Sequence, residues 1–275
     1  MESKETDNPK ATEKDPPSVR GEYLTNALKT VGFGPVLWVE ETGSTNTDLL
    51  NKSLQIDADG MVVIADFQTF GRGRKDRKWM SEPGASLLMS VNFLANTDSV
   101  NLGVFTSGLA IASCEALHSL GFEQVQIKWP NDLMVAVEKR QAKLAGVLAQ
   151  SQIVKNRASV VVGIGINVHP SNLKDVLSER DVISLSDIKT PPDRVELAEK
   201  ILSILADLDF QSPDFWQIYR SLSGTIGQTV KISTDTENLI GIAQDVTNSG
   251  SLLVLDNTGV THEVTSGDLV SLRRL

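Results

Sequence analysis

The chain of 275 residues carries 26 Lys and Arg residues against 35 Asp and Glu residues, a formal net charge of −9. An acidic surface repels polyanions, so this balance argues against a general binder of nucleic acids or anionic membranes. The single cysteine, Cys114, excludes a disulfide framework within the chain and any metal site built from several cysteines.

Residues 1–20 are polar, with five acidic residues, four basic residues and three prolines. So little apolar surface cannot offset the entropy of ordering, and we expect a disordered tail. No helix-turn-helix fits between this tail and the first strand, so DNA binding is not expected. The N-terminus lacks the layout of a secretory signal and no apolar run reaches about eighteen residues, so we expect a cytoplasmic location and no membrane partner.

Strands and helices alternate through the centre of the chain. A hairpin is indicated by two β-rich runs, 144–154 and 158–168, that flank three polar residues. We therefore expect an α/β (α+β) fold, with a mixed β-sheet and flanking helices. Apolar periodicity predicts the further elements: a short helix from Tyr23, helices at 44–54, 106–120 and 195–208, and strands at 36–41, 61–67, 85–93 and 124–129.

The pattern changes after Ser223. Short strands follow one another, joined by turns such as Asn248-Ser249-Gly250 and Asn257-Thr258-Gly259. Turns at intervals of eight to twelve residues are typical of a small antiparallel barrel. We therefore divide the chain into a tail (1–20), a large domain (21–222) and a small C-terminal β-barrel domain (223–275).

The stretch Gly71–Trp79 carries five cations and one acid, a net charge of +4 within an otherwise acidic chain. Its two glycines let the backbone approach a ligand closely. Guanidinium groups match the oxygens of phosphate, so we predict an anion site here rather than a solvated basic loop.

Two common kinds of phosphate-binding site are excluded, because the sequence lacks their motifs. There is no G-x-x-x-x-G-K-[ST] motif, which excludes a P-loop NTPase. Neither Gly71-x-Gly73 nor Gly163-x-Gly165 continues to the third glycine of a dinucleotide fingerprint. We expect a nucleotide held outside those folds, beside Trp79, which either stacks on a base or packs in the interior.

Five short motifs occur in a fixed order: T-G-S-T-N (42–46), Q-T-F-G-R-G-R-K-D-R-K-W (68–79), K-W-P-N-D-L (128–133), K-L-A-G-V-L (143–148) and G-I-G-I-N (163–167). Together they resemble the motifs of biotin–protein ligases, over residues 36–275. The resemblance implies that biotin and ATP form biotinyl-5′-AMP, and that biotin then passes to a lysine of a carrier domain. It also implies a catalytic domain similar to class II aminoacyl-tRNA synthetases and lipoate ligases, with a small SH3-like barrel behind it.

The resemblance assigns biotin binding to residues from four of these motifs. Three of them stand at a predicted helix N-terminus, where hydroxyl and amide groups meet free backbone N–H groups. A plain helix cap is the alternative for Ser44. The biotin-binding residues are Ser44, Thr45, Asn46, Gln68, Gly71, Arg72, Arg74, Lys143, Gly146 and Gly165.

The resemblance makes Arg74 and Lys143 the catalytic cations, because biotin carboxylate and α-phosphate repel each other until they are joined. Asp132 either orients the adjoining turn or acts as a base for the incoming lysine. The ATP- and adenylate-binding residues are Arg72, Arg74, Lys75, Arg77, Trp79, Asn131, Lys143 and Asn167.

The implied partner is the biotin carboxyl carrier domain of a biotin-dependent carboxylase, and the implied assembly is a monomer or weak homodimer. His118, His169 and His262 lie too far apart for metal-ligand spacing, so no metal ligands are assigned and Mg²⁺ is expected to travel with ATP. Two alternatives stay open. One is a lipoate or octanoate ligase or transferase on the same scaffold, and the other is a nucleic-acid-binding module.

Overall fold

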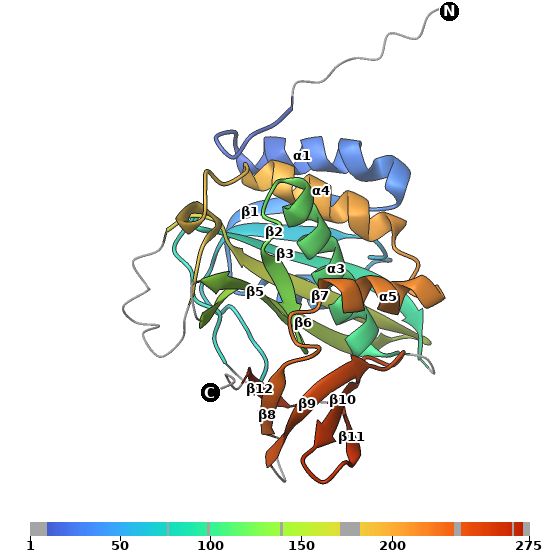
Figure 1. Ribbon diagram of the computed structural model, residues 1–275. Helices are drawn as coiled ribbons and strands as arrows, with labels where there is room; N and C mark the ends of the chain where they lie inside the picture. Colours follow the sequence, from blue (N-terminus) through green and yellow to red (C-terminus); the bar gives the residue numbers. More distant parts are fainter. Residues whose placement is uncertain are drawn as a thin grey trace, which may run out of the picture.

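The computed structural model describes residues 10–75, 77–97, 100–137, 140–170, 182–233, 238–265 and 267–271. A seven-stranded sheet with flanking helices and a five-stranded sheet near the C-terminus dominate it (Figure 1). This arrangement confirms the expected fold class. Among the described helices, none is both long and apolar enough to cross a bilayer.

The large sheet has the strand order β1-β2-β3-β7-β6-β5-β4. β1 and β2 pair in parallel, and the other neighbouring pairs are antiparallel, so the sheet is mixed as predicted. Its strands are β1 (Val36–Thr42), β2 (Val62–Gln68), β3 (Ser86–Asn96), β4 (Val125–Lys128), β5 (Asp132–Val137), β6 (Arg140–Val154) and β7 (Arg157–Asn167).

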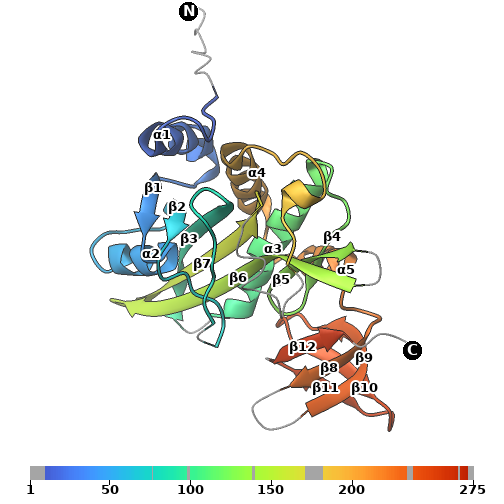
Figure 2. The same ribbon diagram turned by 90° about the vertical axis from the view of Figure 1, so that its left-hand side faces the viewer.

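Alternate side chains of the sheet pack against different helices. Val62 and Ile64 of β2 belong to the main core, whereas Val63 packs with Leu49 of α2. Successive residues of a strand point to opposite faces, so α2 covers the face away from the main core. Figure 2 shows α1 and α4 on one side of β1 and β2, with α2 on the other. The helices are α1 (Pro17–Leu28), α2 (Thr45–Ser53), α3 (Leu102–Ser119), α4 (Arg194–Asp207) and α5 (Pro213–Leu222).

The expectation of a disordered tail is wrong for residues 10–20. Ala11 is 6% exposed, α1 begins at Pro17, and Arg20 is only 3% exposed. A prediction from composition treats charged residues as exposed to water, whereas several of these residues form ion pairs in the fold. The rest of the expected tail, residues 1–9, lies outside the described residues.

A strand and a helix of the large domain are absent from the predicted elements. β5 follows directly on the P-N-D turn, and it pairs with both β4 and β6. α5 starts at Pro213 after Ser212, whose hydroxyl caps the helix by accepting from the backbone N–H of Asp214. Its apolar face, with Phe215, Trp216 and Tyr219, is buried.

The C-terminal sheet is antiparallel, in the order β11-β10-β9-β8-β12. Gly250 and Gly259 occupy the predicted turns with φ of 88° and 86°, a region that favours glycine. Trp129 is 2% exposed and donates from Nε1 to the Gly250 carbonyl at 2.9 Å, which joins the two sheets. The strands are β8 (Thr229–Ser233), β9 (Asn238–Val246), β10 (Leu252–Asp256), β11 (Thr261–Val264) and β12 (Asp268–Ser271).

A buried charge cluster joins α1, β2 and α4. The Asp66 carboxylate accepts hydrogen bonds from both terminal nitrogens of Arg20, at 2.9 and 2.7 Å, and from Arg194 Nη1 at 2.8 Å. Trp38 Nε1 also donates to Asp66, at 3.0 Å, and Arg194 Nε donates to Glu13 at 3.1 Å. Burial raises the pKa of the Asp66 carboxyl, but the hydrogen bonds and guanidinium charges outweigh it and hold the pKa below its ordinary value.

Replacing Asp66 with Asn should destabilise the protein strongly. The side chains of Arg20 and Arg194 are 4% and 6% exposed, so their charges would be left buried without the ionised partner. We expect the free energy of unfolding to fall by about 3 kcal/mol in urea titrations. Asp207→Asn, on an exposed position of α4, is the control and should change it by less than about 0.5 kcal/mol.

Acid should affect the wild type more than Asp66→Asn. A lowered pKa in the folded state means that the ionised carboxylate stabilises the fold above the unfolded-state pKa of about 4. That contribution is lost as pH falls from about 4 through the folded-state pKa. Equal acid sensitivity of the two proteins below about pH 4 would contradict the role given to Asp66.

Candidate functional site

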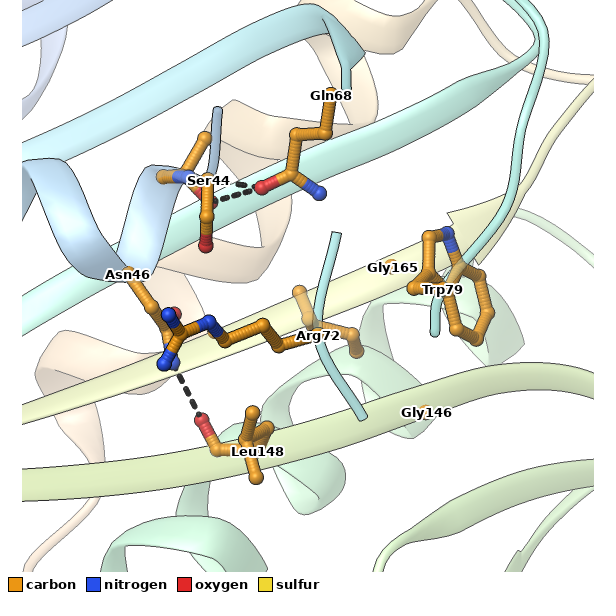
Figure 3. A pocket seen from close by; sticks show the side chains of 11 residues that line it. Ser44, Asn46, Gln68, Arg72, Trp79, Gly146, Leu148 and Gly165 are labelled. Atoms are coloured by element: carbon orange, nitrogen blue, oxygen red, sulfur yellow. Dashed lines mark hydrogen bonds between the residues drawn. The ribbon is translucent and has the colours of Figure 1, made fainter. Parts of the chain in front are cut away.

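A pocket lies on the face of the large sheet that carries α2 (Figure 3). Its walls come from the N-terminal end of α2, the end of β2, the loop that follows β2, and the central strands β6 and β7. The lining residues are Ser44, Thr45, Asn46, Gln68, Arg72, Trp79, Gly146, Leu148, Gly163, Ile164 and Gly165.

Glycines of β6 and β7 make room for the side chains that surround the pocket. A β-carbon at Gly163 would lie 2.1 Å from Asn46 Oδ1, and one at Gly165 would lie 2.5 Å from the Trp79 ring. At Gly146 the nearest Trp79 ring atom would be 3.2 Å away. Larger residues at the first two positions would displace these side chains, so the bare backbone of two strands shapes the pocket.

The N-terminal end of α2 brings polar groups to the pocket. Ser44 is the N-cap residue, but its side chain makes no capping hydrogen bond. Gln68 Oε1 instead accepts from the Thr45 backbone N–H at 2.8 Å. Ser44, Thr45 and Asn46 line the pocket and are each at most 5% exposed.

Asn46 is held by hydrogen bonds on both sides of its amide. Its Nδ2 donates to the Leu148 carbonyl at 3.2 Å, drawn in Figure 3, and to Gln150 Oε1 at 3.0 Å. Its Oδ1 accepts from Ser90 Oγ at 2.6 Å. Ser90 Oγ also lies 2.6 Å from Thr45 Oγ1, so one buried hydroxyl links the first two residues of α2.

The basic loop folds as a small hairpin. Arg72 pairs with Lys78, and the Trp79 backbone N–H donates to the Gly71 carbonyl at 2.9 Å. This hairpin places the Trp79 ring over Gly165, and the indole Nε1 is buried without a partner in the described part of the chain. The Arg72 side chain extends toward Asn46 (Figure 3). The loop therefore closes one side of the pocket.

Two cations stand beside the pocket, each with a polar partner. Lys143 Nζ lies 2.6 Å from Asp132 Oδ1 and 5.8 Å from the centre of the Trp79 ring. Arg74 Nη1 donates to Asn131 Oδ1 at 3.2 Å. Burial lowers the pKa of the Arg74 guanidinium, opposed by nearby carboxylates, but arginine keeps its charge at neutral pH. The P-N-D turn thus orients both predicted catalytic side chains.

Three predicted ATP contacts lie elsewhere. Lys75 Nζ lies 3.5 Å from Asp268 Oδ2 on β12, and Arg77 Nη2 also binds the Asp268 carboxylate. Asn167 donates to the Ile183 carbonyl at 3.2 Å and does not line the pocket. The cations of the loop are therefore divided between the pocket and the C-terminal sheet.

The pocket brings most of the predicted biotin residues together. Gly71 is not among the lining residues, and its carbonyl accepts a hydrogen bond from the Trp79 backbone N–H. Ser90 and Gln150 were missed, although Ser90 interrupts an apolar strand, which signals a buried polar group. The predicted residues that line the pocket are Ser44, Thr45, Asn46, Gln68, Arg72, Trp79, Gly146 and Gly165.

The arrangement suits a ligand that is neutral and polar at one end and anionic at the other. Hydroxyl and carboxamide groups around Asn46 provide donors and acceptors without net charge. Beyond Trp79, the cations of Arg74 and Lys143 favour a carboxylate or phosphate and would stabilise negative charge that develops between them.

Comparison with known proteins places the chain in a family. Residues 38–167 match the Biotin/lipoate A/B protein ligase family, and residues 225–272 match the Biotin protein ligase C terminal domain. The Mycobacterium tuberculosis biotin–[acetyl-CoA-carboxylase] ligase is 35% identical, over 86% of this chain and 88% of that protein. The Escherichia coli bifunctional ligase/repressor BirA is 30% identical, over 91% and 78%.

The fold agrees with these sequence matches. The Aquifex aeolicus biotin protein ligase, solved in complex with biotin and ATP, superimposes with a TM-score of 0.70 and 28% identity. The alignment covers 86% of this chain and 99% of that one. With the pocket formed by the shared motifs, these matches show that the chain belongs to the biotin–protein ligase family.

Proposed function

We propose that this chain is an ATP-dependent biotin–protein ligase. The observation that carries the proposal is the polarity of the pocket, with uncharged polar groups at Asn46 and cations at Lys143 and Arg74. Biotin has the same polarity, with a neutral ureido ring at one end and a carboxylate at the other. The match to the Biotin protein ligase C terminal domain favours biotin over lipoate or octanoate.

In the proposed complex, the ureido ring lies against the N-terminal end of α2. Ser44, Thr45, Asn46 and Gln68 offer the hydroxyl and amide groups that such a ring needs. The aliphatic tail then runs along the backbone of β6 and β7, beside the Trp79 ring that lies over Gly165. This direction carries the carboxylate toward the cations.

In the first step, an oxygen of the biotin carboxylate attacks the α-phosphorus of ATP. The bond to the bridging oxygen breaks, diphosphate leaves, and biotinyl-5′-AMP forms. Arg74 and Lys143 reduce the repulsion between the two anions and stabilise charge on phosphorus. Asp132, 2.6 Å from Lys143 Nζ, holds that ammonium group in place.

In the second step, the ε-amine of a carrier lysine attacks the acyl carbon of the adenylate. AMP leaves, an amide forms and the amine loses a proton. The basic loop, closed over the pocket by Trp79, keeps water from the reactive anhydride in the meantime.

We further propose the acceptor protein, the cellular location, the assembly and the domain bounds of the enzyme. The acceptor is the carrier domain of a biotin-dependent carboxylase, the location is the cytoplasm, and the enzyme is a monomer or weak homodimer with domains at 21–222 and 223–275. Mg²⁺ would arrive with ATP, held by phosphates and water.

A single incubation tests the function. The protein is mixed with biotin, ATP, Mg²⁺ and an apo carrier domain, and the carrier is analysed by mass spectrometry. We expect a gain of one biotinyl group that requires ATP. A gain with lipoate or octanoate, and none with biotin, would favour the alternative acyl substrate.

Lys143→Ala should slow adenylation without abolishing biotin binding. Loss of a cation at the developing charge is expected to lower the single-turnover rate of biotinyl-AMP formation about 100-fold. Biotin affinity measured by calorimetry should change only a few-fold. Lys231→Ala, at an exposed position of β8, is the control, and unchanged adenylation in Lys143→Ala would remove it from the catalytic residues.

Arg74→Gly should still form biotinyl-AMP but release it faster. Without the guanidinium group, one charge-assisted contact to the adenylate is lost, and we expect release to accelerate about tenfold. Rapid filtration measures the retained adenylate. Arg74→Lys, which restores the charge but not the planar fork, should lie between the two, and equal retention in all three would refute the idea.

A further inference from the structure

We infer that Ser90 is a positioning residue, which sets the hydrogen-bonding pattern that the pocket presents to the ureido ring. The inference rests on the proposed biotin site. Ser90 lies on β3 beneath α2, is fully buried and is not among the residues that line the pocket. It acts through its two neighbours, Thr45 and Asn46, which line the pocket.

The direction of each hydrogen bond follows from one backbone carbonyl. The Leu148 carbonyl can only accept, so the Asn46 atom 3.2 Å away must be the amide nitrogen. The second proton of that nitrogen is taken by Gln150 Oε1, at 3.0 Å. The opposite atom is therefore the carbonyl oxygen, which faces Ser90.

The Ser90 hydroxyl has one proton, and Asn46 Oδ1 can only accept it. Thr45 Oγ1 has one proton and lies 2.6 Å from Ser90 Oγ and 3.1 Å from Gln68 Oε1, and the shorter distance assigns that proton to Ser90. The Thr45 hydroxyl thus keeps its lone pairs for other donors. The Thr45 backbone N–H donates to the Gln68 side chain, so the accepting atom is the amide oxygen, Oε1. Gln68 Nε2, on the other side of that amide, is therefore a donor.

This series of hydrogen bonds fixes which donors and acceptors the pocket offers to a ligand. Asn46 Oδ1 lies over Gly163 and accepts one hydrogen bond from Ser90, so it retains a second lone pair, and Gln68 offers N–H groups. A cyclic urea needs acceptors for its two N–H groups and donors for its carbonyl. If Ser90 lost its hydroxyl, Asn46 and Thr45 would lose the bonds that fix this pattern.

Ser90→Ala is therefore expected to weaken biotin binding about tenfold, measured by calorimetry. The matched control is Ser159→Ala. Ser159 Oγ donates to Asn92 Oδ1 at 2.5 Å, and both residues are fully buried on the same sheet but do not line the pocket. Both variants lose a buried Ser–Asn bond, so we expect similar falls in thermal stability and a wild-type biotin affinity in Ser159→Ala alone.

Ligand analogues separate positioning from a general loosening of the pocket. 2-Iminobiotin replaces the ureido carbonyl by an imine, whereas desthiobiotin keeps the ureido ring and lacks the sulfur. In Ser90→Ala the preference for biotin over 2-iminobiotin should shrink, and the preference over desthiobiotin should not. If the alanine variant does not fold, the same measurements are made on Ser90→Cys, which retains a weak hydrogen-bond donor.

The outcomes distinguish this inference from the proposed function. Wild-type protein that fails to bind biotin would overturn both together. Wild-type binding with an unchanged affinity and analogue preference in Ser90→Ala would overturn only the role of Ser90. Equal losses of biotin affinity in Ser90→Ala and Ser159→Ala would also overturn it, because the effect would then be one of stability.

Discussion

The alternation of side chains along β7 is the constraint on which the site depends. Val162, Ile164 and Ile166 point into the main core, and the intervening positions, Gly163 and Gly165, carry no side chain. One face of this central strand is therefore filled with branched apolar groups, while the other carries no side chain at Gly163 and Gly165. Because these glycines lie beneath α2 and the basic loop, Asn46 and the Trp79 ring can approach the central strand closely and form the pocket with it.

Electrostatics then divides this space. The chain is acidic as a whole, yet its basic loop carries a net charge of +4. Lys75 and Arg77 of the loop are paired with Asp268 at the surface, where ion pairs contribute little to stability. Arg74 is more buried and contacts the P-N-D turn, next to the Lys143–Asp132 pair. The average charge thus hides a local concentration of cations where an anionic ligand would bind.

Much of the fold and site could be predicted from local patterns. β2 and α2 have clear apolar periodicity and lie within a residue or two of their predicted bounds. The short motifs identified Asn46 and Gly165, because these residues of the site lie within short contiguous stretches of sequence. Elements that form only through contacts with neighbouring segments were harder to predict. β5 is a short apolar run that becomes a strand by pairing on both sides, and α1 starts earlier than predicted because a buried ion pair with Asp66 holds Arg20.

Contacts between distant segments could not be predicted at all. Ser90 and Asn46 are 44 positions apart, and Arg77 and Asp268 are 191 positions apart. Nothing in the sequence around Asp268 indicates that its partner belongs to the basic loop. Such pairs are decided by tertiary packing, which composition and periodicity do not describe.

The distribution of tryptophans gives the protein its own optical reporter. Trp38, Trp129 and Trp216 are each at most 5% exposed and lie in the core. Trp79 is the one of the four that lines the pocket, with its indole against the backbone of β7. A change of emission on ligand binding would thus originate at the one ring that lines the pocket, and binding can be followed in unlabelled protein.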